Sequence, residues 1–146
     1  MSLNIRYDND LAVSDYNDLR EIVGWNRIPE QQVQAGLRGS DFVIAAKDGE
    51  RTIGMSRVLT DGGCVVLILD VVVHPEYQGL GIGRALMEAV MKFIHGRMAL
   101  GEVSHICLMA AKGKEEFYKK FGFEERPNDI RGAGMTQWIK RETKEQ

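Results

Sequence analysis

Short apolar runs and turn signals alternate along the first half of the chain and predict strands and helices in a definite order. Residues 3–7 predict a short β-strand. Two short helices are expected after it, over residues 14–24 and 29–39, because each segment has apolar residues on one side and ends at a glycine. Residues 41–47 and 51–59 predict a β-hairpin, since Asp48 and Gly49 between them are a strong turn signal.

The second half contains a longer apolar run, residues 64–73, which is continuous rather than alternating. Such continuity is typical of a central strand covered on both faces. Apolar positions then recur at helical spacing over residues 85–94, followed by a buried strand at 105–109, a short helix at 115–121 and a final strand at 135–139. An antiparallel meander thus leads into a β-α-β unit, which predicts a single α/β domain over residues 1–146 with a mixed sheet.

Residues 67–84, LILDVVVHPEYQGLGIGR, place a glycine-rich loop between the central strand and the helix that follows. Free backbone N–H groups and the helix dipole make such a junction a site for a phosphate group. The loop is not a P-loop, because no Gly-Lys-Ser/Thr occurs in the chain. The dinucleotide fingerprint GxGxxG fails too, since its third glycine would fall at Arg84 or Leu86.

Composition narrows the range of partners. The 146 residues are 44% hydrophobic and 27% charged, and the net charge of −2 gives no electrostatic reason to expect nucleic acid or an anionic membrane as a partner. No signal-peptide core and no apolar run near the ~20 residues that cross a bilayer are present, so a cytoplasmic protein is expected. Cys64 and Cys107 lack metal-ligand spacing, so we expect buried, reduced thiols and no metal site.

One combination of motifs points to a known family. The segment Q-x-x-G-x-G, residues 78–83, follows a strand that ends in V-H-P, and residues 117–123 read FYKKFGF. Together these motifs, within residues 66–84 and 104–123, resemble the GNAT superfamily of N-acetyltransferases. The order of elements resembles that superfamily over nearly the whole chain. The resemblance implies an α/β, GNAT-like fold: a mixed, mostly antiparallel sheet of six to seven strands with a central splayed parallel pair, flanked by about four helices.

The resemblance also implies acetyl-coenzyme A as the co-substrate. Glycines let the loop backbone approach the pyrophosphate closely, and Gln78 and Arg84 can add side-chain donors. A splayed strand end can pair with the amides of the pantetheine arm as if the arm were an added strand. The expected cofactor-binding residues are Val71, Val72, Val73, Gln78, Gly79, Leu80, Gly81, Ile82, Gly83 and Arg84.

Acetyl transfer to an amine requires a neutral amine, a donor to the thioester oxygen and a proton for the departing thiolate. Tyr118 stands where the family's tyrosine supplies that proton, although an aromatic residue there also suits core packing. The resemblance implies a backbone N–H near Val71 or Val72 as the donor to the oxygen. Asp70, an ionisable residue in an apolar strand, would orient the ammonium or take its proton through water, unless it is a structural carboxylate bonded to backbone groups.

One departure from the family is Ala111, which stands seven residues before the tyrosine, where many members have an asparagine that bonds the pantetheine. That contact must be lost or supplied by another group. The acceptor is expected, by resemblance, near the first two helices. The Trp25 ring there could line the site of an apolar or aromatic amine, or it could pack between the two helices. Arg27 could bind a carboxylate or phosphate of the acceptor.

The sequence therefore predicts an N-acetyltransferase that acts on a primary amine by direct transfer in a ternary complex, with a small-molecule amine favoured. Two alternatives are a protein or peptide amine as the acceptor and a non-catalytic module that only binds coenzyme A. A homodimer is left open beside a monomer. No nucleic-acid, membrane or metal partner is expected.

Overall fold

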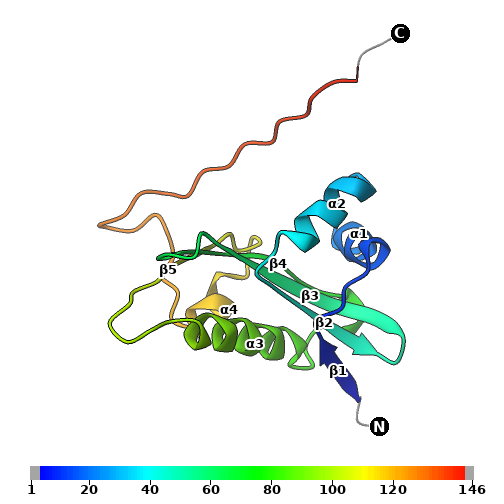
Figure 1. Cartoon of the computed structure of the whole chain (residues 1–146), viewed down its shortest axis with the longest axis horizontal. Helices are drawn as coiled ribbons and strands as arrows, with labels where there is room; N and C mark the ends of the chain where they lie inside the picture. Colours follow the sequence, from blue (N-terminus) through cyan, green and yellow to red (C-terminus); the bar gives the residue numbers. More distant parts are fainter. Residues whose placement is uncertain (1–3, 144–146) are drawn as a thin grey trace. The chain divides into compact units, whose positions relative to one another are not determined.

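The computed structural model describes residues 4–143, which form two compact units divided after residue 108. Among the described residues, the first unit contains all five strands, three α-helices and one short 3₁₀ helix. Figure 1 shows the arrangement of this unit. Its elements, in chain order, are β1 (Ile5–Asp8), α1 (Val13–Ile22), α2 (Glu30–Arg38), β2 (Phe42–Asp48), β3 (Arg51–Thr60), β4 (Val65–Val73), the short 3₁₀ helix η1 (Pro75–Tyr77), α3 (Ile82–Gly96) and β5 (His105–Leu108).

Five strands, in the order β1-β2-β3-β4-β5, make up the sheet of the described residues. The pairs from β1 to β4 are antiparallel, and β4 pairs with β5 in parallel. The expected mixed sheet and the hairpin at Gly49 are thus confirmed, with a slightly lower strand count. The parallel pairing joins residues 65–68 to His105–Leu108, whereas β4 continues to Val73. The end of β4 therefore extends past its β5 partner.

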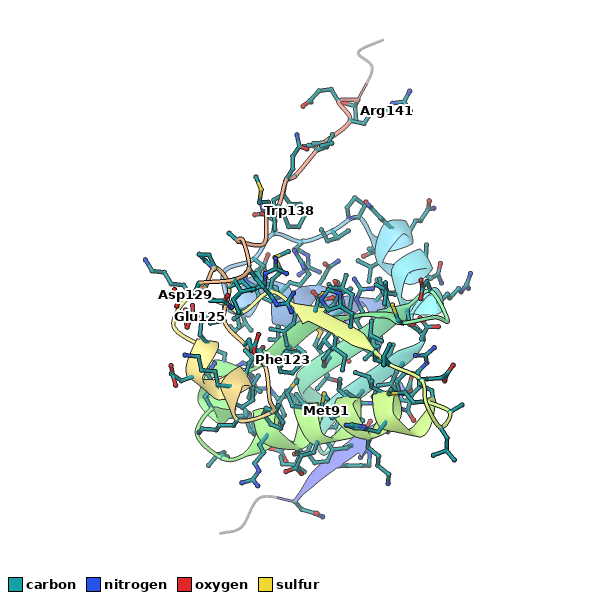
Figure 2. The ribbon with its side chains drawn as sticks, turned by 90° about the vertical axis from the view of Figure 1, so that its left-hand side faces the viewer. Met91, Phe123, Glu125, Asp129, Trp138 and Arg141 are labelled. Carbon is teal, nitrogen blue, oxygen red and sulfur yellow. The ribbon has the colours of Figure 1, made fainter. Side chains whose placement is uncertain are left out.

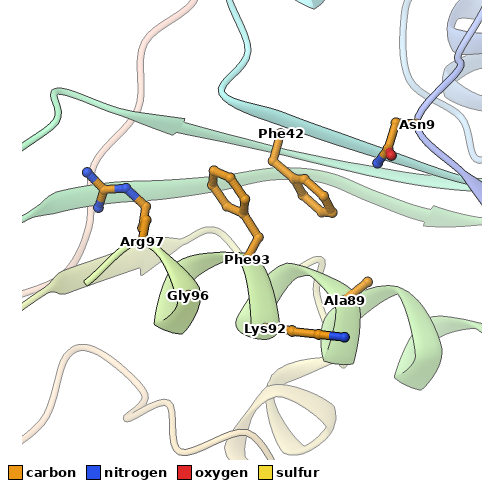
Figure 3. A pocket seen from close by; sticks show the side chains of 7 residues that line it. All are labelled: Asn9, Phe42, Ala89, Lys92, Phe93, Gly96 and Arg97. Atoms are coloured by element: carbon orange, nitrogen blue, oxygen red, sulfur yellow. The ribbon is translucent and has the colours of Figure 1, made fainter. Parts of the chain in front are cut away.

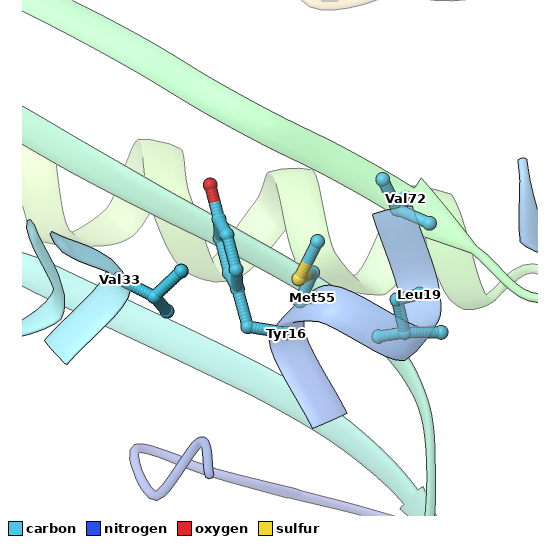
Figure 4. Close-up of a cluster of buried hydrophobic side chains, with 5 residues drawn as sticks. All are labelled: Tyr16, Leu19, Val33, Met55 and Val72. Atoms are coloured by element: carbon cyan, nitrogen blue, oxygen red, sulfur yellow. The ribbon is translucent and has the colours of Figure 1, made fainter. Parts of the chain in front are cut away.

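Helices cover both faces of this sheet (Figure 1). On one face α1 and α2 pack through a cluster of five buried side chains from four elements (Figure 4): Tyr16, Leu19, Val33, Met55 and Val72. On the other face lies α3, whose buried residues recur three or four positions apart: Ile82, Leu86, Met87, Val90 and Ile94. The apolar period predicted this helix correctly, and the buried stripe holds it against the sheet.

An irregularity lies in the middle of β4. Met55 of β3 pairs with Val72, but Arg57 pairs with Leu69, so two steps along β3 correspond to three along β4. The extra residue makes a β-bulge at residues 70–71. Asp70 has a φ of 55°, and it is the one non-glycine residue with positive φ in the part of the chain described. The apolar pattern of residues 64–73 gave no sign of this bulge.

The second unit contains one helix among its described residues, α4 (Glu115–Lys119), which a turn ends at Gly122. The strand expected at residues 135–139 is not formed. These residues have no strand partner, and Trp138 is 81% exposed (Figure 2). A short segment with apolar residues does not by itself make a strand, because the backbone groups of a strand need a neighbouring strand to bond.

The expectation for the cysteines is also corrected. Cys64 is exposed and Cys107 is only partly buried. Cys64 lies in the turn that precedes β4, and its carbonyl accepts a hydrogen bond from the N–H of His105. The apolar run therefore includes one residue that belongs to the turn rather than to the buried strand.

Candidate functional site

The glycine-rich loop connects η1 to α3. Gly79 and Gly81 have φ angles of 79° and 83°, in the left-handed region. A Cβ at either position would meet no heavy atom within 4 Å, so the backbone conformation rather than lack of space requires glycine. Gly81 is the N-cap of α3, and within residues 4–143 no side chain caps this helix. The N–H groups of its first turn are therefore available to an anion.

The loop is tied to the end of β4 by a side chain. The Gln78 amide donates to the Val73 carbonyl over 3.1 Å. Gln78 was expected to donate to the phosphates. One N–H of its amide is used by Val73, which is itself one of the predicted cofactor-binding residues. Arg84, the other expected donor, is largely exposed and pairs with Glu88 one turn along α3 at 2.9 Å. An exposed pair of this kind is weak and leaves Arg84 able to meet an incoming phosphate.

The end of β4 has one side without a strand. Val72 and Val73 pair with Met55 and Gly54 of β3, but β5 ends at Leu108, opposite Ile68. Residues 69–73 therefore have no partner from β5 among the described residues. Gly54 permits the close approach of β3, because a Cβ there would lie 3.2 Å from the Val72 carbonyl oxygen. The loop and this open strand end are consecutive in the chain and lie in the same unit.

Asp70 lies at the bulge in this strand end, and its carboxylate is held by three side chains. Tyr16 donates its hydroxyl to Oδ2 over 2.8 Å, and Arg57 donates its Nε to the same oxygen over 2.6 Å. Arg20 approaches Oδ1 at 3.5 Å. We call these four residues the Asp70 cluster. The carboxylate is held by side chains, whereas the structural alternative raised by the sequence had placed it on backbone groups.

The Asp70 cluster is buried and carries more positive than negative charge. The side chains of Asp70 and Arg20 are 10% and 8% exposed. Burial lowers the pKa of Arg57, but the hydrogen bond and charge of Asp70 outweigh this effect and raise that pKa overall. Burial, followed by the charge of Asp70, raises the pKa of Tyr16, so the phenol stays a donor at neutral pH. Both oxygens of the carboxylate thus face cationic or neutral donors.

A family comparison identifies the family to which the chain belongs. The acetyltransferase (GNAT) domain matches residues 38–125, which include the hairpin, the bulged strand, the glycine loop, α3, β5 and α4. The chain belongs to the GNAT acetyltransferase family. It is therefore an acyltransferase, and acetyl-coenzyme A is the co-substrate that the family uses. The matched region crosses the boundary between the two compact units.

Relatives and a solved structure agree with this assignment. The chain is 32% identical over 127 residues to the N-acetyltransferase ycf52 of Porphyra purpurea, covering 84% of this chain and 71% of that protein. It is 34% identical to serotonin N-acetyltransferase 2, chloroplastic, of Oryza sativa subsp. japonica, over 89% of this chain and 65% of that protein. Histone acetyltransferase TAP1 of Glycine max is 33% identical over 84% of this chain and 56% of that protein.

The solved structure is that of SA2161 from meticillin-resistant Staphylococcus aureus, a probable acetyltransferase. It is 30% identical to this chain with a TM-score of 0.81, over 92% of this chain and all of that one. The GNAT fold is therefore confirmed by an experimental structure as well as by the sequence match. The chain spans little more than half of the Glycine max relative and less than two thirds of the rice relative.

The residues present fit coenzyme A on the phosphate side. Two left-handed glycines, an uncapped helix N-terminus and an open strand end are the features that an extended pyrophosphate-bearing ligand requires. Tyr118, the predicted proton donor of this GNAT domain, lies on α4 in the second unit. Its ring packs edge-on against Phe117 and Phe123, and burial raises its pKa above 10.0. Its role as a donor stays a prediction.

The two residues expected to bind the acceptor have different surroundings. Trp25 is partly buried against the apolar cluster of α1 and α2, and the Arg20 guanidinium lies 5.4 Å from the centroid of its ring. Trp25 thus contacts the Asp70 cluster through Arg20. Arg27 is exposed and pairs with Asp18 at 2.9 Å and with Glu21 at 3.7 Å. These contacts support a packing role for Trp25 and leave acceptor binding by either residue as a prediction.

Sequence reasoning missed Tyr16, Arg20 and Arg57, which surround Asp70. A signal for them was available, because an ionisable residue in an apolar strand needs charged or hydrogen-bonding partners. Arg57 is the arginine in the middle of the neighbouring hairpin strand. The two partners from α1 could not be inferred, since they depend on how this helix packs across the sheet.

A hollow of about 540 Å³ lies between α3 and β2, lined by none of these residues (Figure 3). Phe42 and Phe93 stack in it with ring centroids 4.7 Å apart. None of its lining residues belongs to the loop, the strand end or the Asp70 cluster. Over residues 4–143 the structure has no cluster of residues suited to a metal ion. No helix in the same range is long and apolar enough to span a membrane.

Proposed function

We propose that this protein transfers the acetyl group of acetyl-coenzyme A to a primary amine of a small molecule, directly and in a ternary complex. The observation that supports this most is the continuity between the open end of β4 and the uncapped, left-handed glycine loop. One segment thereby offers unpaired strand backbone and a helix N-terminus in succession. A thioester carried on a long arm with a pyrophosphate requires both features.

In this proposal the backbone N–H groups of residues 79–84, which include the first turn of α3, bind the phosphates. The side chains of Gln78 and Arg84 add further donors. Val73 and its neighbours bind the arm. A backbone N–H at Val71 or Val72 donates to the thioester oxygen as negative charge develops there. Tyr118 gives its proton to the departing sulfur, since a phenol with a raised pKa is fully protonated at neutral pH.

The acceptor must reach the thioester as a neutral amine. We assign removal of its proton to water and keep Asp70 as the carboxylate that orients the ammonium. Oδ2 already accepts from Tyr16 and Arg57, and Oδ1 lies 3.5 Å from Arg20, which favours a fixed anion over a proton carrier. A direct transfer is favoured over an acyl-enzyme, because Cys64 lies in a turn before β4 and Cys107 lies on β5, outside the loop and strand end.

The choice of a small amine follows from charge. The net charge of −2 gives only a weak electrostatic reason to expect a lysine-rich protein tail as the acceptor. The names of the relatives point both ways, since one is a serotonin and another a histone acetyltransferase. A protein or peptide amine is therefore the second candidate. The predicted cytoplasmic location and the alternative of a homodimer stay predictions.

The test is release of free coenzyme A thiol from acetyl-coenzyme A in the presence of a panel of arylalkylamines, polyamines, amino sugars and lysine peptides. Turnover with one class of small amine and none with peptides supports the proposal. Turnover with peptides alone contradicts the substrate class. Binding of coenzyme A by calorimetry without thiol release for any amine would establish the non-catalytic alternative.

A further inference from the structure

The backbone at Asp70 adopts a conformation that its residue type disfavours. Its φ of 55° lies in the left-handed region, where L side chains with a Cβ are strained. Glycine would adopt it freely, and asparagine or aspartate tolerate it better than other residues do. Strained backbone persists only where the surroundings hold it in place, and it concentrates at functional sites.

The surroundings that hold Asp70 come from two other elements. Arg57 projects from β3, the strand paired with β4 at the bulge, and Tyr16 and Arg20 project from α1. The two guanidinium groups each lie 5.9 Å from the centroid of the Tyr16 ring. Arg57 is further fixed by Ser40, whose Oγ lies 3.4 Å from its Nη1. The side chain of the bulge residue is thus attached both to the sheet and to the helix above it.

The contacts of Asp70 fit a holding role better than proton exchange. Oδ2 accepts hydrogen bonds from Tyr16 and Arg57, and Oδ1 lies 3.5 Å from the Arg20 guanidinium. Each oxygen of the carboxylate therefore has a donor beside it. A carboxylate that accepts and releases a proton in every turnover needs an oxygen that the proton can reach.

We propose that Arg57, together with Tyr16 and Arg20, is a positioning residue: it holds the Asp70 carboxylate and thereby keeps the bulge of β4 in the conformation on which the acyl site at Val71 and Val72 depends. This inference rests on the proposed function, because it assigns those two residues to the thioester. It also links α1 to the acyl site. Asp70 is then a fixed anion that holds the bulge and orients the ammonium, and it is not the base.

The test compares Arg57→Met, Arg57→Lys and Asp70→Asn with Lys47→Met as the matched control. Lys47 also makes a largely buried ion pair on the same sheet, with Asp8 at 2.8 Å, but it does not touch Asp70. The turnover number, the KM for acetyl-coenzyme A and its Kd are measured for each, after circular dichroism and thermal unfolding show a folded protein. Tyr16→Phe, which keeps its ring in the core, is the milder variant if Arg57→Met does not fold.

Arg57→Met is expected to lower kcat by at least about tenfold with less than about threefold change in the Kd for coenzyme A, since the glycine loop is untouched. Arg57→Lys is expected to recover part of the loss, and Lys47→Met to match the parent. Asp70→Asn keeps the shape and an accepting oxygen, so it is expected to retain kcat within about tenfold of the parent and the same pH profile. A loss above about a hundredfold with a flattened profile makes Asp70 the base and overturns the proposal.

Amide hydrogen exchange separates this proposal from the proposed function. Arg57→Met is expected to speed exchange at residues 70–72 and in α1, but not in α3. If the parent turns over no amine, the proposed function fails while this result still supports the held bulge. Unchanged exchange in a folded Arg57→Met protein overturns the positioning role whether or not the parent is active.

Discussion

At the scale of single residues, the sequence showed that Asp70 needs an explanation but did not show which residues surround it. Asp70 stood out because a carboxylate in an apolar strand demands an explanation, and the structure supplies one in Tyr16, Arg20 and Arg57. The unfavourable φ of Asp70 costs roughly 1–2 kcal/mol. Charge-assisted hydrogen bonds contribute roughly 1.5–3 kcal/mol each, so the two shortest contacts offset that cost.

Tyr118 is the residue with the most direct kinetic prediction. Tyr118→Phe removes the proposed proton donor and leaves the ring packed between Phe117 and Phe123, so kcat is expected to fall by at least about tenfold. The Kd for coenzyme A is expected to stay nearly constant, because the proposed phosphate site lies in the loop before α3. Steady-state thiol release and calorimetry measure the two quantities.

The control for this variant is Tyr7→Phe, since Tyr7 lies on β1 and is partly exposed. It is expected to match the parent in both measurements. A Tyr118→Phe enzyme with kcat within about threefold of the parent excludes the general-acid role.

At the scale of elements, local sequence signals predicted the structure correctly where a turn, a helical period or a left-handed glycine requires particular residue types. The two-residue turn at Gly49 and Glu50 set the hairpin, and the apolar period set α3. The glycines set the loop, because only glycine adopts the left-handed angles of Gly79 and Gly81 without strain. The bulge in β4 had no comparable signal, since Asp70 adopts its angle only with help from other elements.

Gly81→Ala tests the loop. Placing a Cβ on a residue with φ of 83° is expected to destabilise the protein by roughly 1 kcal/mol, and to weaken coenzyme A binding because the loop shifts to relieve the strain. Gly96→Ala is the matched control, since Gly96 lies in α3, also has open space at its Cβ and has no left-handed angle. It is expected to be neutral or stabilising by up to about 1 kcal/mol. Urea unfolding measures the free energy of unfolding, and calorimetry measures the Kd for coenzyme A. Equal Kd values for the two variants contradict the assigned role of the loop.

At the scale of the whole molecule, all four tyrosines have a pKa raised in the folded state. Burial is the main cause at Tyr7, Tyr16 and Tyr118, and the hydrogen bond to Asp48 is the main cause at Tyr77. A phenol with a raised folded pKa keeps its proton to higher pH in the folded state than in the unfolded state. Its stabilising contribution is present below the unfolded pKa of 10.0 and is lost as pH rises through the folded pKa.

The free energy of unfolding is therefore expected to fall above about pH 10. Urea unfolding at a series of pH values, with tyrosinate absorbance recorded in parallel, measures this fall. Tyr16→Phe is expected to reduce the slope above pH 10.0 without creating a slope near neutrality, because it removes one of the groups that titrate late. A parent protein whose unfolding midpoint is constant across this range contradicts the prediction.

The sequence by itself determined the order of elements up to α4, the glycine-rich loop and the family, because these depend on local periodicity, turn chemistry and glycine at fixed spacing. Tertiary structure alone decided the partners of Asp70, the bulge that carries it and the number of strands. Residues 135–139 were predicted as a strand but have no strand beside them, and Asp70 has its partners 13 to 54 positions away in the chain. Contacts between distant segments carry no local pattern, so they emerge only when α1, β3 and β4 pack together.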